Sequence, residues 1–245
     1  MTPTIDLIRA HRSVRKFTDR EVDDHTLTAI IAAAQCAATS HFVQAYSVIR
    51  VRDMAKRQVI SELAGPQVWV ARAPVFLVFC ADFNRLETAC GMHGTAVDKG
   101  SAEQFVTATV DTALLAQNVL LAAESLGMGG VYIGGIRNDP QTVCDLLEIP
   151  DQAYPVFGMC LGWPAQDPPS KPRLPLEAVL FTDRYPQDHD ADMLAAYDRT
   201  INHYFLNRDT NLKDETWTRQ MADFMGRVFR PHMKAFLEKK GFFLK

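Results

Sequence analysis

The spacing of apolar and polar residues in the first third of the chain predicts helices and strands in turn. A proline opens a short helix over residues 3–10, and an acidic pair offers N-cap oxygens to a helix over about 23–36. Residues 46–51 alternate apolar and polar side chains, which is typical of a strand. Residues 75–80 are apolar throughout, as expected of a strand that is covered on both faces.

The rest of the chain continues this mixture. The predicted elements follow in order: a loop over 90–100, a helix over 102–126, a short strand over 131–135, a helix over 140–147, a strand over 156–161, and an irregular connection over 162–175. The helix over 102–126 is apolar on every side, so we expect it in a core or a subunit interface. From about Asp190 the chain reads as entirely helical. The order of elements predicts an α+β fold, a sheet layered with helices, plus a helical C-terminal extension.

Composition narrows the class of protein. The chain has 245 residues, 26 Lys and Arg against 29 Asp and Glu, and a formal charge of −3, which argues against nucleic acid as the main partner. A hydrophobic share of 47% is ordinary for a globular protein. No signal-peptide layout and no uninterrupted apolar run of the ~20 residues that span a bilayer are present, so we expect a cytoplasmic protein without a membrane partner.

The five cysteines form no C-x-x-C pair, so neither a disulfide framework nor a zinc site is predicted. Cys36, Cys80, Cys144 and Cys160 lie in apolar stretches and are expected to be buried. The seven histidines show no metal-ligand spacing, and neither a nucleophile elbow nor a P-loop occurs. The sequence therefore predicts no metal and none of the common hydrolytic or phosphoryl-transfer chemistry.

Two basic motifs stand out in this acidic chain. One is His11-Arg12-Ser13-Val14-Arg15-Lys16, and the other is Lys171-Pro172-Arg173 in the proline-rich connection. Arginine forks match phosphate oxygens, and a serine hydroxyl can complete an anion cradle. Taken alone, each motif is better explained as a solvated surface turn or loop, but two of them modestly raise the chance of a shared phosphate.

Glycines surround the predicted strand Gly129-Gly130-Val131-Tyr132-Ile133-Gly134-Gly135. Backbone without a Cβ allows a flat ligand to approach closely, although a tight strand between two turns explains the pattern as well. The spacing is not that of a dinucleotide fingerprint. Thr39-Ser40-His41-Phe42 and Gln67 add hydrogen-bonding groups between apolar segments.

Together these motifs resemble the nitroreductase family of FMN flavoproteins, and within it the oxygen-insensitive NADPH-dependent group of enteric bacteria. The resemblance covers nearly the whole chain and also rests on Cys80-Ala81-Asp82-Phe83-Asn84-Arg85, Ala122-Ala123-Glu124-Ser125-Leu126-Gly127 and Leu161-Gly162-Trp163-Pro164. It implies a sandwich with a mainly antiparallel central sheet, helices on its faces and an intertwined homodimer. It also implies an FMN-binding core over residues 1–185 and a helical extension over 186–245 that provides dimer and coenzyme contacts.

The resemblance gives each motif a role. Arg12, Ser13, Lys171 and Arg173 match positions that hold the FMN phosphate, with His11 nearby, and Arg15 matches a cation of catalytic importance at the flavin pyrimidine edge. Thr39, Ser40 and Gln67 match polar contacts to the flavin, and the backbone of Tyr132, Ile133, Gly134 and Gly135 matches the strand that lies against its ring. A guanidinium at that edge would stabilise the negative charge that arrives with two electrons.

NADPH and substrate would be met by His41, Phe42, Arg208, Lys213 and Arg230. Three features depart from the enteric pattern: His41 stands where a serine-rich loop is expected, Lys213 replaces an arginine, and the stretch over 89–100 is longer. The resemblance implies hydride transfer from NADPH through flavin N5 to nitroaromatics, quinones and related small molecules. The alternatives are a flavin reductase that supplies reduced FMN, and a flavin-binding protein without turnover.

Overall fold

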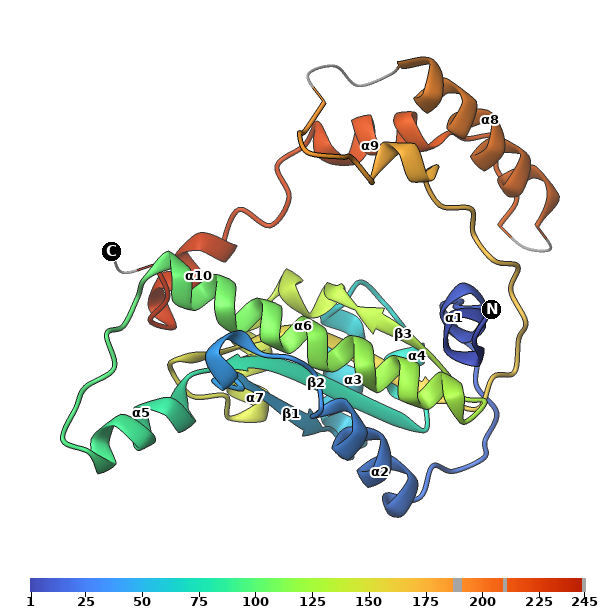
Figure 1. The fold of residues 1–245 in the computed structure, drawn as a ribbon. Coiled ribbons are helices and arrows are strands. Elements are labelled where there is room, and N and C mark those ends of the chain that lie inside the picture. Colours follow the sequence, from blue (N-terminus) through green and yellow to red (C-terminus); the bar gives the residue numbers. More distant parts are fainter. Residues whose placement is uncertain (187–190, 209–210, 244–245) are drawn as a thin grey trace. The chain divides into compact units, whose positions relative to one another are not determined.

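The computed structural model describes residues 1–186, 191–208 and 211–243 (Figure 1). The chain forms two compact units. The first contains Met1–Asp167 and the chain from Arg230 onward, and the second contains Pro168–Phe229. This division differs from the expected boundary at 185/186, because the chain leaves the first unit at 168 and returns to it at 230.

The first unit is built on a four-stranded sheet with the order β1-β2-β4-β3. Its strands are β1 (Tyr46–Arg50), β2 (Val75–Asp82), β3 (Gly129–Ile133) and β4 (Ala153–Gly162). All three strand pairings are antiparallel, and the β2–β4 pairing shifts register between Phe79 and Cys80. The predicted α+β fold with a mainly antiparallel sheet is confirmed.

Strand β2 is apolar along its length because both faces of the sheet are covered. Its side chains alternate between two core clusters: Val75, Leu77 and Phe79 belong to one, and Phe76, Val78 and Cys80 to the other. The first cluster packs α2 (Asp24–Ala34) and most of α6 (Ala102–Ser125). The second packs α3 (Met54–Leu63), α4 (Trp69–Arg72), α7 (Pro140–Leu147) and α10 (Met233–Lys239), with Ala108 of α6. The central strand therefore determines where both helical layers pack.

Side-chain caps start these helices where the sequence predicts. Asp23 accepts a hydrogen bond from the Thr26 amide at 2.7 Å, and Asp139 accepts one from Thr142 at 3.1 Å. Ser101 and Gln104 form a complete capping box at the start of α6. Each cap satisfies an amide that has no partner within its helix.

The predicted strand over 131–135 is displaced. Strand β3 begins at Gly129 and ends at Ile133, and residues Gly134–Asn138 turn into the 3-10 helix η2. A Cβ on Gly135 would lie 2.2 Å from the carbonyl oxygen of Ala64 at the end of α3. The chain leaves the sheet here because its backbone packs directly against another backbone.

Helices α1 (Pro3–Arg9) and α5 (Asn84–Met92) complete the early part of the first unit. The sequence predicts no element where α3, α4 and α5 lie. Residues 90–92, predicted to begin a loop, form the last turn of α5 instead. Helix α6 has the length and a mean hydropathy of 1.4 that also occur in membrane spans, a test that core helices pass as well. It lies along the sheet in Figure 1 and contributes Leu115, Val119 and Leu120 to the core. Cys80, Cys144 and Cys160 are buried as predicted, whereas Cys36 is exposed because α2 ends two residues before it.

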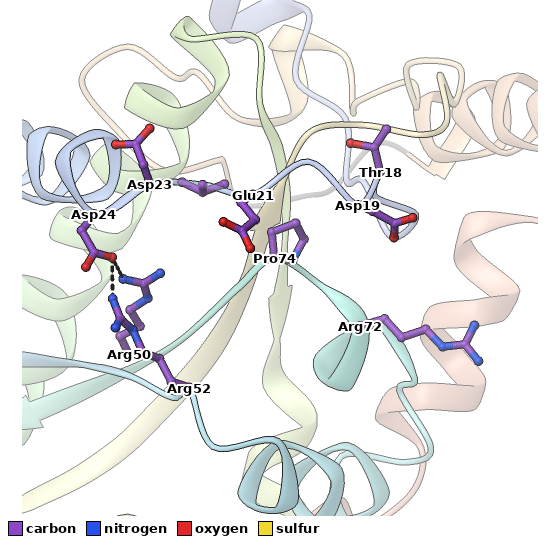
Figure 2. A pocket seen from close by; sticks show the side chains of 10 residues that line it. Thr18, Asp19, Glu21, Asp23, Asp24, Arg50, Arg52, Arg72 and Pro74 are labelled. Carbon is purple, nitrogen blue, oxygen red and sulfur yellow. Dashed lines mark hydrogen bonds and ion pairs between the residues drawn. The ribbon is translucent and has the colours of Figure 1, made fainter.

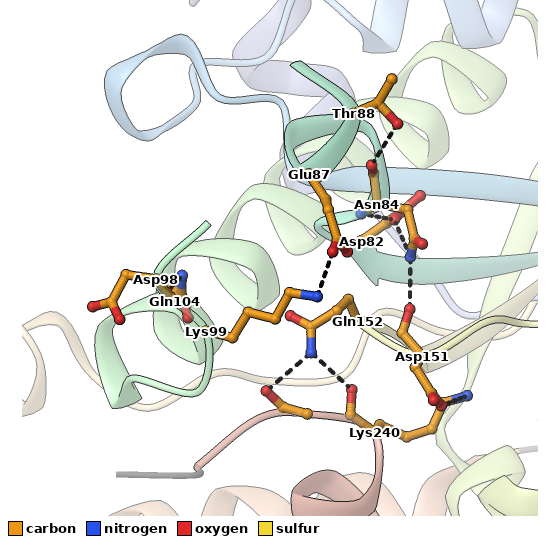
Figure 3. Close-up of polar contacts among 11 residues, drawn as sticks. Asp82, Asn84, Glu87, Thr88, Asp98, Lys99, Gln104, Asp151, Gln152 and Lys240 are labelled. Carbon is orange, nitrogen blue, oxygen red and sulfur yellow. Dashed lines mark hydrogen bonds and ion pairs between the residues drawn. The ribbon is translucent and has the colours of Figure 1, made fainter. Parts of the chain in front are cut away.

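The last residues of the chain return to the core of the first unit through α10 (Met233–Lys239). Phe236, Leu237 and Phe242 are buried there. The backbone N–H of Gln152 donates to the carbonyl oxygen of Lys240 at 2.8 Å, and the Lys240 ammonium donates to the carbonyl oxygen of Ile149 at 2.9 Å. Figure 3 shows this polar contact region.

The second unit is helical. It contains η3 (Leu176–Ala178), α8 (Ala191–Asn207) and α9 (Trp217–Met225). Tyr197, Ile201 and Phe205 of α8 form its small core, against which Leu174, Tyr204 and Trp217 pack. The chain after Asp190 is not entirely helical as predicted, because residues 211–216 and 226–232 connect the helices without forming one. Residues 187–190, 209–210 and 244–245 of the predicted extension lie outside the described residues.

Replacing glycine by alanine should have opposite effects on the free energy of unfolding at two positions, Gly130 and Gly91. A Cβ at Gly130 would lie 2.7 Å from Leu161 Cδ2 and 2.8 Å from Leu120 Cδ1, whereas a Cβ at Gly91 in α5 would meet nothing within 4 Å. We expect Gly130→Ala to lower the free energy of unfolding by about 1–3 kcal/mol through overpacking. Gly91→Ala should raise it by about 0.5–1 kcal/mol, since alanine favours the helix. Urea denaturation of both variants measures the two values, and equal effects would contradict the packing described.

Candidate functional site

The first basic motif lies beside strand β3. Ser13 forms a parallel bridge with Gly130, and the Val14 amide donates to the Gly130 carbonyl oxygen at 2.9 Å. A Cβ on Gly129 would lie 2.6 Å from Val14 Cγ2, so the glycine permits this approach. The structure therefore brings the motif and the glycine-flanked strand, which are more than 100 residues apart, to one edge of the sheet.

Two side chains of this motif, His11 and Arg12, have acidic partners. His11 Nδ1 lies 2.6 Å from Glu124 Oε1 on α6. Arg12 forms an ion pair with Asp167, which is 82% exposed. An anion at Arg12 would compete with a carboxylate that water already screens, and such exposed pairs contribute little.

Arg15 begins a chain of contacts that ends at the η2 turn. Its guanidinium carbon lies 5.9 Å from the centroid of the Trp69 ring. The indole N–H of Trp69 donates to Gln67 Oε1 at 3.2 Å, and Gln67 Nε2 donates to the Ala64 carbonyl oxygen at 2.7 Å. That carbonyl is the group against which Gly135 packs. Arg15, Gln67 and Gly135 therefore belong to one local assembly.

Trp69 is the residue of this assembly that sequence reasoning missed. It lies in a helix of four residues, too short for a periodic signal. Its one sequence signal is its place two residues after Gln67, which the resemblance does select.

The segment from Thr39 to Gln44 is a second candidate region. Ser40–Phe42 form the 3-10 helix η1, and His41 and Phe42 have left-handed φ angles of 46° and 59°. Phe42 is 80% exposed, whereas the Thr39 hydroxyl is buried and has no hydrogen-bond partner among the described residues. A buried hydroxyl without a partner is unfavourable unless a ligand or water completes it.

The strand residues of the predicted site differ in what they can contact. The Ile133 side chain is fully buried in the core, so a ligand could meet its backbone but not its side chain. Tyr132 packs edge-on against Phe157, with ring centroids 5.0 Å apart, and its hydroxyl donates to Gln117 at 3.5 Å. Burial raises the pKa of Tyr132, with a smaller contribution from Glu124, so it stays neutral.

The second unit gathers cations around one aromatic ring. Lys171 Nζ, Arg208 Cζ and Lys213 Nζ lie 5.5, 4.7 and 4.4 Å from the Phe205 ring centroid. Burial lowers the pKa of Lys171, and the neighbouring charges of Lys213, Arg173 and Arg208 lower it further. The resemblance divides these four cations between two ligands, whereas the structure groups them as one cluster that disfavours its own positive charge.

Arg230 belongs to the first unit, whereas the cations around Phe205 belong to the second. Its Nε donates to Asn138 Oδ1 at 2.9 Å, and Asn138 in turn donates to the Leu63 carbonyl oxygen at 3.0 Å. The three cations that the resemblance assigns to NADPH or substrate are therefore found in two units.

A surface hollow of about 630 Å³ contains none of the predicted site residues. It is lined by Thr18, Asp19, Glu21, Val22, Asp23, Asp24, Arg50, Arg52, Arg72 and Pro74 (Figure 2). Asp24 accepts hydrogen bonds from Arg50 and Arg52, which hold the pKa of its carboxyl below the usual value. These three charges are satisfied by one another.

Comparison with known proteins covers both parts of the chain. Residues 8–163 match the Nitroreductase family, and residues 171–245 match the Nitroreductase family, C-terminal domain. The chain is 46% identical to the oxygen-insensitive NADPH nitroreductase of Salmonella typhimurium over 241 residues, which is 98% of each sequence.

Two solved structures resemble the chain along its whole length. Nitroreductase A from Vibrio parahaemolyticus matches with a TM-score of 0.93 and 40% identity, covering 100% of both chains. The NADPH:FMN oxidoreductase from Vibrio harveyi, complexed with NAD+, matches with a TM-score of 0.91 and 38% identity over 100% of both chains. With its antiparallel sheet, its glycine-flanked edge strand and its two matched segments, the chain belongs to the nitroreductase family.

Proposed function

We propose that this protein is an FMN-dependent oxidoreductase that takes hydride from NADPH and reduces nitroaromatics, quinones and related small molecules. The observation that carries the proposal is the assembly of Arg15, Trp69, Gln67 and Gly135 beside β3. It combines an exposed guanidinium, an anchored amide and a backbone stretch without Cβ atoms. A flat, electron-accepting ring that gains negative charge needs all three.

Three features of the first unit fit an FMN molecule. The buried Thr39 hydroxyl has no partner in the described chain and would bond to the flavin. Gly135 packs without a Cβ against the Ala64 carbonyl oxygen, and this contact brings the turn after β3 to Gln67, where a flavin ring would meet backbone and an amide. Arg12 and Ser13 offer a guanidinium and a hydroxyl of the kind that hold phosphate.

When bound, FMN would accept hydride at N5 and deliver it to the acceptor. Arg15 would hold a fixed positive charge at the pyrimidine edge and so stabilise the reduced cofactor over the oxidised one. The stacking of Arg15 near Trp69, and the anchoring of Trp69 through Gln67, keep that charge in place. No side chain of this set needs to form a covalent bond or transfer a proton to the ring.

The cation cluster of the second unit would bind the 2′-phosphate of NADPH. Arg208 presents a guanidinium fork, and Lys213 presents a compact charge that salt screens readily. Because neighbouring cations lower the pKa of Lys171, a bound dianion would raise it again and relieve the repulsion. His41 and Phe42 would contact the acceptor or the nicotinamide.

The protein is proposed to act as a homodimer in the cytoplasm. Val106, Val110 and Leu114 are spaced four residues apart on α6 and are 51%, 47% and 44% exposed. A stripe of this kind on a core helix is apolar surface that a second subunit would cover.

A flavin reductase that releases reduced FMN is the second candidate. The Vibrio harveyi relative, an NADPH:FMN oxidoreductase, favours it. Both activities use the same site and differ in the acceptor that enters it.

The purified protein tests the main proposal directly. We expect a yellow protein with noncovalent FMN and ping-pong kinetics, because NADPH and acceptor would use one flavin face in turn. Steady-state rates with NADPH and a nitroaromatic, a quinone or free FMN should give parallel double-reciprocal lines. A colourless protein that takes up no FMN, or intersecting lines, would refute it, and free FMN as the best acceptor would favour the second candidate.

Coenzyme preference tests the second-unit cluster. Arg208→Ala should lower kcat/KM for NADPH about tenfold to a hundredfold, as expected for the loss of a charged hydrogen bond, and should leave NADH almost unchanged. Arg219→Ala is the matched control, since Arg219 lies in the same unit, is 76% exposed and pairs only loosely with Glu215 at 3.9 Å. An equal loss of kcat/KM with NADPH and NADH would contradict the assignment of Arg208 to the 2′-phosphate.

Subunit association tests the apolar stripe. Val110→Lys should shift the FMN-loaded protein from dimer to monomer, since it would bury an unpaired charge at the proposed interface. Val59→Lys is the control, since Val59 is a valine of α3 that is 38% exposed and lies on another helix, and it should leave the mass unchanged. Light scattering coupled to size-exclusion chromatography measures both, and a monomeric wild-type protein would exclude the dimer.

A further inference from the structure

The loop between Thr39 and Ala45 has a strained backbone. His41, Phe42 and Gln44 have φ angles of 46°, 59° and 53°, in the left-handed region that favours glycine. Each residue keeps this conformation only where the surrounding structure holds it. Packing at the tip does not do so, because His41 and Phe42 are exposed.

Asp111 of α6 accepts hydrogen bonds from the residues on both sides of the strained segment. Its Oδ1 accepts from the Ser40 amide at 3.0 Å, and its Oδ2 accepts from the Ala45 amide at 3.2 Å. Asp111 is 1% exposed, and Ala45 is fully buried. Hydrogen bonds to a charged acceptor in such surroundings are among the stronger ones in proteins. Both ends of the segment are thus fixed to one carboxylate on a core helix.

This carboxylate is costly for the fold alone. No ion pair of Asp111 occurs within the described parts of the chain, and a buried charge without a counter-ion must be offset by its hydrogen bonds. An apolar side chain could fill the same space without that penalty. What the carboxylate adds is the conformation of the loop.

We propose that Asp111 is a positioning residue that holds His41 and Phe42 in the conformation that receives NADPH and the acceptor. This inference rests on the proposed function. A loop that is competent for only part of the time lowers the apparent affinity by that fraction and leaves the maximal rate unchanged. Releasing the clamp should therefore raise KM for both substrates, measured with the enzyme saturated with FMN, while kcat stays the same.

Asp111→Asn tests the clamp from the side of the helix. The amide keeps one acceptor but turns an N–H₂ group toward the second backbone N–H. We expect KM for NADPH and for a quinone to rise about tenfold or more. The matched control is Thr112→Val, at the next buried position of α6, whose hydroxyl donates to the Ala108 and Cys80 carbonyl oxygens and not to the loop. It should lower the melting temperature and leave both KM values unchanged.

Ser40→Pro tests the clamp from the side of the loop and avoids the core. It removes one donor to Asp111, and Thr39 before it has φ −134° and ψ 153°, a conformation that precedes proline readily. Ser40→Ala is its control, since both lose the hydroxyl and only the proline loses the N–H. The KM values should rise in Ser40→Pro relative to Ser40→Ala.

Amide hydrogen exchange provides a readout that needs no turnover. The peptide that covers residues 39–46 should exchange faster in Asp111→Asn and Ser40→Pro than in the two controls. Unchanged exchange would overturn the proposal, and so would faster exchange with unchanged KM values in an active enzyme. If the two variants exchange faster but the wild-type protein itself oxidises no NADPH, the clamp exists and the proposed function is wrong.

Discussion

The fold depends on covering both faces of the central strands. β2 pairs with β1 and β4, and its side chains enter two separate cores, so neither helical layer can be removed without exposing one of them. This constraint fixes α2 and α6 on one face and α3, α4 and α7 on the other. The candidate site then forms from the segments that border the sheet, namely the motif beside β3, the turn after β3 and the loop before β1.

Missing side chains are as important to this site as those that are present. Gly129 admits Val14, and Gly135 admits the end of α3. The first contact places Ser13 and Arg15, the chain neighbours of Val14, beside strand β3. The second places Gln67 and Trp69 beside the turn after β3. The glycines thus connect the packing of the core to the placement of the functional groups.

The polar groups around the site are largely positioned before any ligand arrives. His11 bonds to Glu124, Gln67 to Ala64 and Trp69, and Asp111 to two loop amides. Groups held in this way lose little freedom on binding and respond little to the reaction, which is how a protein stabilises charge without a nucleophile of its own. The exposed tip of His41 and Phe42 is held by local hydrogen bonds, such as that from the Phe42 amide to the Thr39 carbonyl oxygen at 3.3 Å, and by the fixed ends of its loop.

The sequence by itself determined the class of fold, the caps of α2 and the long helix α6, because alternation, apolar runs and capping residues are local signals. Through a family resemblance it also selected Arg15, Gln67 and Gly135, which belong to one local assembly in the structure. Only the tertiary structure decided that Trp69 contacts Arg15 and Gln67, and that Lys171, Arg208 and Lys213 lie around the ring of Phe205. It also decided that Asp111 holds both ends of the strained loop. These are contacts between residues distant in sequence or in short helices, and no periodicity along the chain records which side chains a fold brings face to face.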